Sequence, residues 1–185
     1  ATLNEDGTLS GTIRLDGMGA LDSRLRRIVY NSQKRALADV FAGVLGNMSD
    51  AVEVKSIEHH PVMDFEGFMW LEIEYEIPGY ATMIDGGLEF SPAAINAVKD
   101  HGYLFRAGSI DWADERTTDV FLYYTQRIEI NENIKLPRGY ELANDVNVEA
   151  MDETFASFTQ DATMDGRTLK LHSRTEVKRR QFGPS

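Results

Sequence analysis

Apolar and polar positions alternate along much of the chain with a period of two, which is typical of half-buried β-strands. The clearest example is Val120–Leu142, which we predict to be the central strand followed by a turn. The inward face of this strand consists of apolar residues of one parity: Leu122, Tyr124, Ile128 and Ile130. The alternation ends where Pro137 removes a backbone donor and Gly139 permits a positive φ, so the turn is predicted at the Leu-Pro-Arg-Gly-Tyr segment.

Further strands are predicted from the same period and from turn dipeptides. Leu3–Leu15 contains Asp6-Gly7 and is a predicted β-hairpin. A second hairpin is predicted from Thr154–Thr163 and Arg167–Val177, which flank the turn that contains Asp165-Gly166. Phe68–Ile77 alternates apolar residues with three glutamates, which predicts a strand with one core face and one solvated face. A shorter strand is predicted at Val52–Ile57.

The period changes to that of a helix between Leu21 and Leu45. Two apolar stripes in this segment differ in phase, and one straight helix cannot bury both against one surface. A break is therefore predicted near Asn31-Ser32, followed by a helix that ends at Leu45. Three residues of this second helix are expected to be fully buried: Leu37, Phe41 and Val44.

About eight or nine strands and one or two helices follow from these patterns. Turn-separated strands without alternating helices predict a mainly β fold, an antiparallel β-sandwich with one or two amphipathic helices packed against it. A chain of 185 residues is long enough to form a substantial core. We expect residues 1–185 to be a single β-sandwich domain, and the start at Ala1 without an initiator Met suggests a fragment of a longer chain.

Charge and composition exclude several classes of partner and of site. The net charge of −11 repels phosphate backbones, so no nucleic-acid partner is expected. No apolar run approaches the ~20 residues that a membrane-spanning helix requires, so no membrane span is expected. The chain contains no cysteine, which excludes a thiol nucleophile, a thiolate metal site and a disulfide within it.

Three polar constellations are weak candidates for chemistry. Adjacent His59 and His60 lack the spacing of a helical metal pair and fit a turn. The acidic segment Asp111–Asp119 has oxygen ligands of the kind calcium prefers, but a solvated loop explains it as well. A carboxylate-based hydrolase would need two facing carboxylates from this set: Glu72, Glu74, Glu76, Asp85 and Glu89. We assign no catalytic, cofactor-binding or metal-binding residue.

Aromatic residues around the central strand form the remaining candidate site. An exposed aromatic row can stack against sugar rings, which makes three residues possible ligand contacts: Trp112, Phe121 and Tyr123. The favoured interpretation is that Phe121 and Tyr123 are buried under the helix or a neighbouring loop.

Several short motifs in chain order resemble the C-terminal β domain of bacterial transglutaminase-like proteins. They are Asp6-Gly7-Thr8 with its strand, Gly19 followed by Arg24, the helix, Leu71–Tyr75, Phe90 with Pro92, and Leu136–Tyr140. The resemblance implies an exported protein, periplasmic or extracellular, with a papain-like core upstream that carries a Cys-His-Asp triad. No position here matches that triad.

The sequence thus predicts a non-catalytic accessory β-sandwich domain that positions this upstream core or binds a substrate or partner, protein or polysaccharide. The alternatives are a carbohydrate-binding module and a carboxylate-based hydrolase.

Overall fold

The computed structural model describes residues 1–32, 34–46, 49–94, 119–122, 125–143 and 148–183. The described residues are mainly β, with 47% in strands and 16% in helices, and they form a large mixed sheet and two helices. The predicted fold class is therefore confirmed. In the described residues, no helix has the length and apolar character needed to cross a bilayer.

One sheet of eight strands dominates the structure, in the order β3-β4-β2-β1-β8-β11-β10-β9. Its first half comprises β1 (Thr2–Leu3), β2 (Leu9–Asp16), β3 (Glu53–His59) and β4 (Trp70–Ile77). Its second half comprises β8 (Gln126–Lys135), β9 (Val148–Asp152), β10 (Ala156–Asp165) and β11 (Thr168–Val177). All neighbours are antiparallel except β1 and β8, which are parallel and join the two halves.

Two small two-stranded sheets accompany this sheet. β5 (Thr82–Ile84) pairs with β6 (Gly87–Glu89), and β7 (Val120–Phe121) pairs with β12 (Gln181–Phe182). The predicted Asp-Gly turns are confirmed, because Gly7 and Gly166 adopt φ values of 82° and 60° between the expected strands. At Gly7 a Cβ would lie only 2.5 Å from the carbonyl oxygen of Ala81, so glycine is required for space as well as for φ.

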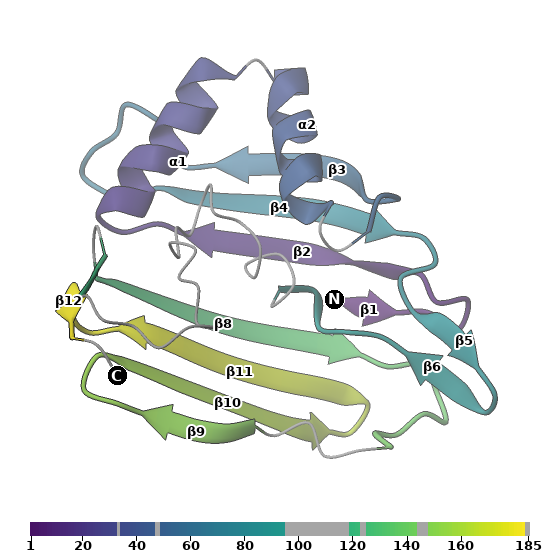
Figure 1. Ribbon diagram of the computed structural model, residues 1–185. Helices are drawn as coiled ribbons and strands as arrows, with labels where there is room; N and C mark the ends of the chain where they lie inside the picture. The colour runs from purple at the N-terminus through teal and green to yellow at the C-terminus, as the bar shows by residue number, and fades with distance from the viewer. Residues whose placement is uncertain (33, 47–48, 95–118, 123–124, 144–147, 184–185) are drawn as a thin grey trace.

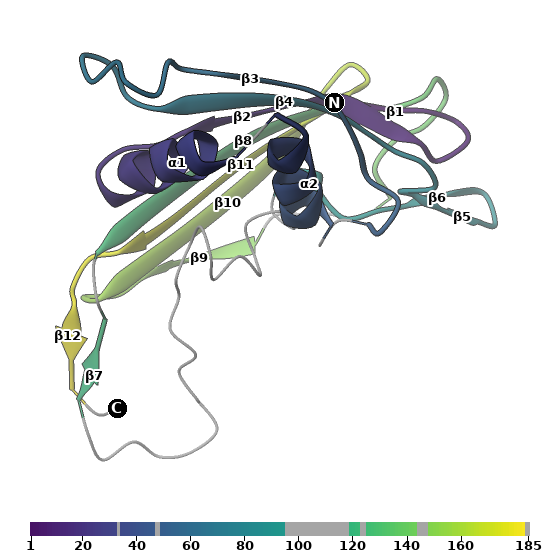
Figure 2. The same cartoon turned by 90° about the horizontal axis from the view of Figure 1, so that it is seen from above.

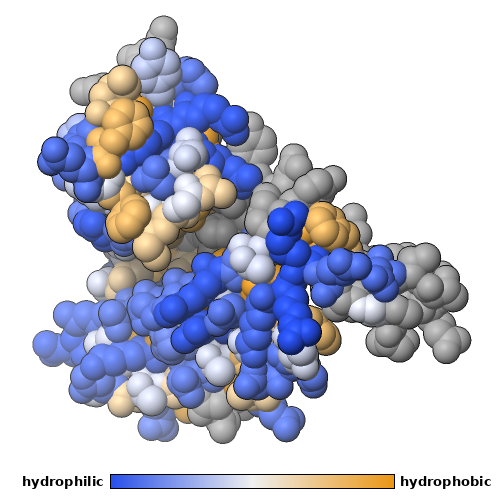
Figure 3. Space-filling model, turned by 90° about the vertical axis from the view of Figure 1, so that its left-hand side faces the viewer, coloured by the Kyte–Doolittle hydropathy of each residue, from blue (hydrophilic) through white to orange (hydrophobic). Residues whose placement is uncertain are grey.

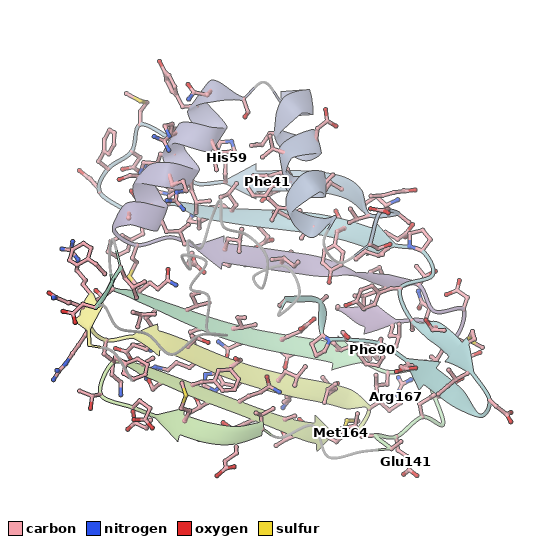
Figure 4. All side chains as sticks on the ribbon, in the orientation of Figure 1. Phe41, His59, Phe90, Glu141, Met164 and Arg167 are labelled. Atoms are coloured by element: carbon pink, nitrogen blue, oxygen red, sulfur yellow. The ribbon has the colours of Figure 1, made fainter. Side chains whose placement is uncertain are left out.

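The two helices lie on one face of the sheet and form the covering layer of the fold (Figure 2). α1 (Ala20–Asn31) and α2 (Lys34–Leu45) are separated at the predicted break. Phe41 points from α2 toward the sheet and is 0% exposed (Figure 4). Leu37 is also buried, but Val44 is only partly buried and Leu45 takes its place in the core, because the buried stripe of α2 follows positions 37, 41 and 45.

The core lies between these helices and the sheet. The inward residues of β4 are buried as predicted: Leu71, Ile73, Tyr75 and Ile77. They meet apolar residues of β2 in register, with Leu9 opposite Ile77 and Ile13 opposite Ile73. Leu25 and Val29 of α1 belong to the same core cluster.

The predicted central strand differs from the structure in its bounds. Val120–Phe121 pairs with β12 in a separate two-stranded sheet, so the strand in the large sheet begins only at Gln126. Leu122 therefore lies outside β8, and Tyr124 lies outside the described residues. The parity is confirmed, but burial is deepest in the second half of the stretch, where Ile134 and Leu136 are 0% and 5% exposed. The predicted turn is confirmed by Gly139, whose φ is 82°.

Candidate functional site

A buried arginine on α1 is the best-connected polar side chain of the described residues. Arg26 is 7% exposed and lies on the apolar side of the helix, beside Leu25. Its Nε and Nη2 atoms donate to the two carboxylate oxygens of Asp22, one helical turn earlier, at 3.0 and 3.2 Å. This bidentate pair is charge-assisted, and its geometry fixes the plane of the guanidinium.

The Nη1 and Nη2 atoms of the guanidinium also hold the backbone of the loop between β3 and β4. Arg26 donates to the carbonyl oxygens of Val62, Asp64 and Gly67 at 2.9, 2.7 and 2.7 Å. Asp22 also accepts the backbone N–H of Met69 at 2.6 Å. The pKa of Asp22 lies below its ordinary value, chiefly because of the hydrogen bonds from Arg26. The ion pair therefore anchors this loop to α1 at several points along its backbone.

This anchored loop presents three large apolar side chains to solvent, and Met18, which precedes α1, adds a fourth. We call these four residues the apolar loop surface. Their exposed fractions are 69% for Met18, 70% for Met63, 73% for Phe65 and 65% for Phe68. The N–H of Gly17 donates to the carbonyl of Met69 at 2.8 Å, which places Met18 beside the end of the loop. Figure 3 shows apolar side chains gathered over the upper part of the molecule, at the level of the helices. Clustered exposed apolar residues mark interaction sites in soluble proteins.

The loop surface has a defined conformation and an acidic rim. The guanidinium carbon of Arg26 lies 5.0 Å from the centre of the Phe65 ring, which orients that ring by a cation–π contact. Asp64 and Glu66 flank Phe65 and are exposed. The arrangement can contact an apolar surface at its centre and basic groups at its edge.

Sequence reasoning missed this site because its parts are far apart in the chain. The available signal was local: Asp22 and Arg26 have the i, i+4 spacing of a helical ion pair, and Arg26 lies among the apolar positions of the stripe. A charged residue on the core side of a helix implies a buried partner. The partners of Arg26 in the loop are 35 to 41 residues away and follow from no sequence pattern.

A second buried charge lies on β8. Glu132 is 7% exposed and accepts the backbone N–H groups of Ala93 and Ala94 at 3.0 and 3.1 Å. Burial raises the pKa of this carboxyl, and the two hydrogen bonds oppose that rise. Its inward position could be read from the parity it shares with Ile130 and Ile134, but its backbone partners could not. Glu132 attaches the backbone of Ala93 and Ala94 to the sheet.

Three of the carboxylates considered for a hydrolase each contact a different polar side chain. Glu72 lies 3.8 Å from Arg14, Glu76 lies 3.3 Å from Lys55, and Glu74 accepts a hydrogen bond from the Ser56 hydroxyl at 3.0 Å. These three glutamates alternate with the buried residues of β4, so they lie on the outer face of the sheet. The remaining two, Asp85 and Glu89, are exposed on the β5–β6 hairpin.

The side chains of the two candidate histidines contact neighbouring groups at the end of β3. The Nδ1 atom of His59 lies 2.9 Å from the carbonyl oxygen of His60, and the Nε2 atom of His60 lies 3.4 Å from the Asp64 carboxylate. Among the residues that the structure describes, no three His, Asp or Glu side chains are grouped to hold a metal ion.

Of the three possible ligand contacts, only Phe121 is described. It is 60% exposed, so the favoured interpretation that it is buried is wrong for this residue. The reason is that β7 pairs with the C-terminal β12, apart from the large sheet, and the Arg180 guanidinium lies 4.9 Å from the Phe121 ring centre. Trp112 and Tyr123 lie outside the described residues, as does the Asp111–Asp119 segment except Asp119, which accepts a hydrogen bond from Gln181 at 2.8 Å.

Comparison with known families gives one match. A family model described as a domain of unknown function with a solved structure, DUF3858, matches residues 86–185. The chain belongs to the DUF3858 family. No curated protein and no solved structure matches the chain. The DUF3858 match covers β6 to β12, whereas the apolar loop surface lies before it in the sequence.

Proposed function

We propose that this chain is a non-catalytic accessory domain that docks on a protein partner through the apolar loop surface. The observation that carries the proposal is the anchoring of the loop by Arg26. A loose loop exposes apolar side chains because its backbone moves, but here the backbone is held by a buried guanidinium while Phe65 and Phe68 remain exposed. Burial of such a side chain is worth roughly 1.5–3 kcal/mol, which a docked partner would recover.

We further propose that the partner is an upstream transglutaminase-like core of the same parent protein, in an exported protein of the periplasm or the cell exterior. The motifs that resemble the C-terminal β domain of that family support this assignment. In this proposal the Cys-His-Asp chemistry belongs to the core, and the present domain positions it. The ion pairs of Glu72 with Arg14 and of Glu76 with Lys55 on the outer face of the sheet support a structural role for these carboxylates.

Hydrogen exchange on the parent protein tests the docking. The amides of residues 61–69 would be compared between the isolated chain and the parent protein that includes its upstream segment. Docking predicts stronger protection of this loop in the parent protein. In Phe65→Ser/Phe68→Ser the added protection should be lost, whereas Tyr30→Ser, a control at a 72% exposed aromatic on α1, should retain it.

Two results would overturn the proposal. One is equal exchange of residues 61–69 in the two proteins, which would show that the loop remains solvated in the parent. The other is turnover above buffer when the isolated chain is assayed for amide hydrolysis and cross-linking, which would show catalysis by the domain itself.

A carbohydrate-binding role is the second candidate, and the exposure of Phe121 favours it. The Arg180 guanidinium lies 4.9 Å from the ring centre, and the exposed part of Phe121 could stack against a sugar. Isothermal titration against a panel of polysaccharides, with Phe121→Ala as the control, tests this role. Flat titrations throughout would remove it.

A further inference from the structure

An open groove lies at the end of the sheet where three turns meet, away from the apolar loop surface. Its volume is about 590 Å³, within the usual range of ligand sites. One wall is formed by the turn between β1 and β2, and the other by the ends of β8 and of the β10–β11 hairpin. Figure 4 shows Arg167 at this end of the sheet. Leu3, Leu136 and Pro137 are buried and give the groove an apolar floor.

The cations of this groove differ from most of the other basic side chains that the structure describes. Acidic residues outnumber basic ones by 30 to 19, so a carboxylate is available to most basic side chains. Ion pairs accordingly hold these: Arg14, Arg26, Lys55, Arg127, Lys170, Arg174 and Lys178. By contrast, no carboxylate in the described part of the chain lies within ion-pair distance of Lys135, Arg138 or Arg167, and all three line the groove.

The opposite wall carries the complementary charge. Glu5 and Asp6 line the groove from the β1–β2 turn, and one oxygen of Asp6 accepts the N–H of Thr8 at 2.9 Å. The remaining carboxylate oxygens of this wall are acceptors for N–H groups. A ligand therefore meets guanidinium and ammonium donors on one side, carboxylate acceptors on the other, and an apolar floor between them.

We propose that this groove binds an extended acidic peptide, whose carboxylates contact the basic wall of the groove. The guanidinium groups of Arg138 and Arg167 suit bidentate contacts with carboxylates, and Glu5 and Asp6 suit peptide N–H groups. A glycan fits less well, because none of the lining residues, all of them described, is aromatic, and sugar rings stack on aromatic faces. At physiological ionic strength charges beyond about 8 Å are largely screened, so the local cations act despite the negative charge of the whole chain.

Titration followed by amide NMR tests the proposal, with an acetylated and amidated tetraglutamate peptide as the probe. Shifts are expected at the amides of residues 2–6, 135, 136, 138 and 167, saturating by about 10 mM peptide at physiological ionic strength and weakening as more salt is added. Tetraglutamine and tetragalacturonate serve as the uncharged and the carbohydrate comparison.

Matched double variants give the control. Arg138→Gln/Arg167→Gln should weaken binding at least tenfold. Arg27→Gln/Arg179→Gln removes the same charge from exposed sites outside the groove and should leave binding within twofold of the wild type. Both pairs are exposed, so thermal unfolding should be unchanged. Absence of saturable shifts, equal weakening by the two double variants, or equal binding of tetragalacturonate would each overturn the proposal.

Discussion

Replacement of Arg26 by methionine is the sharpest test of how the apolar loop surface is built. Methionine keeps an unbranched stem of similar length and removes every donor. The variant leaves Asp22 with its bond from Met69, and it leaves the carbonyls of Val62, Asp64 and Gly67 without the guanidinium.

The expected loss is about 3 kcal/mol of unfolding free energy. Removal of one partner of a buried ion pair costs about 3–5 kcal/mol, and a hydrogen bond to a charged group contributes about 1.5–3 kcal/mol. The Asp22 side chain is 19% exposed and the loop lies at the surface, so water can replace part of what is lost. This places the expected value at the lower end of the range.

Urea unfolding measures the change, and hydrogen exchange locates it. Arg27→Met is the matched control, because Arg27 follows on the same helix and is exposed; its effect should stay within about 0.5 kcal/mol. The amides of residues 61–69 should exchange faster in Arg26→Met than in the control. A loss below about 1 kcal/mol with unchanged exchange would refute the view that Arg26 anchors the loop.

Three further predictions concern the core, a buried charge and two glycines. Phe41→Ala should lower the unfolding free energy by about 3–5 kcal/mol, whereas Val40→Ala, at a 40% exposed site, should cost less than about 1 kcal/mol; equal losses would mean that α2 is not docked. The raised pKa of Glu132 means that the folded state binds a proton more readily than the unfolded state, so this group contributes stability that grows as pH falls from 7 toward 4. The unfolding free energy of the wild type relative to Glu132→Gln should therefore rise over that range, and an unchanged difference would contradict the burial of the charge. Gly7→Ala should destabilise by about 2 kcal/mol or more because of its φ of 82° and the contact with Ala81, while Gly43→Ala in α2, where an added Cβ meets nothing within 4 Å, should stabilise by about 0.5–1 kcal/mol; the same sign for both in thermal unfolding would contradict the reasoning.

Local features of the fold could be predicted from the sequence because neighbouring residues determine them. Asp6-Gly7 and Asp165-Gly166 specify tight turns without reference to the rest of the chain, and both hairpins form as expected. The break after Asn31 follows from the phase of two stripes within one segment. The alternation in β4 fixes which face is buried because the side-chain period of a strand is two.

Features that depend on distant segments could not be predicted. Val120 and Phe121 alternate in phase with the strand that follows, yet they pair with residues 181 and 182, and nothing local distinguishes the two outcomes. The parallel pairing of β8 with β1 likewise depends on the tertiary fold and not on the local sequence. The anchoring role of Arg26 depends on carbonyl groups, which every residue has and no sequence pattern marks.

The parallel contact between β1 and β8 has a mechanical consequence for the whole sheet. Ten residue pairs join β8 to β11, but the register between β1 and β8 is a single pair, Thr2 with Lys135, with backbone bonds from the Ala1 ammonium to Asn133 and from Lys135 to Ala1 on either side. These contacts close a loop of more than a hundred residues, so their entropy cost is high for few bonds. In the described structure each half of the sheet is extensively paired, but the two halves are joined to one another by few bonds. Under a pulling force across the strands, we expect the β1–β8 contact to open first while each half of the sheet stays intact.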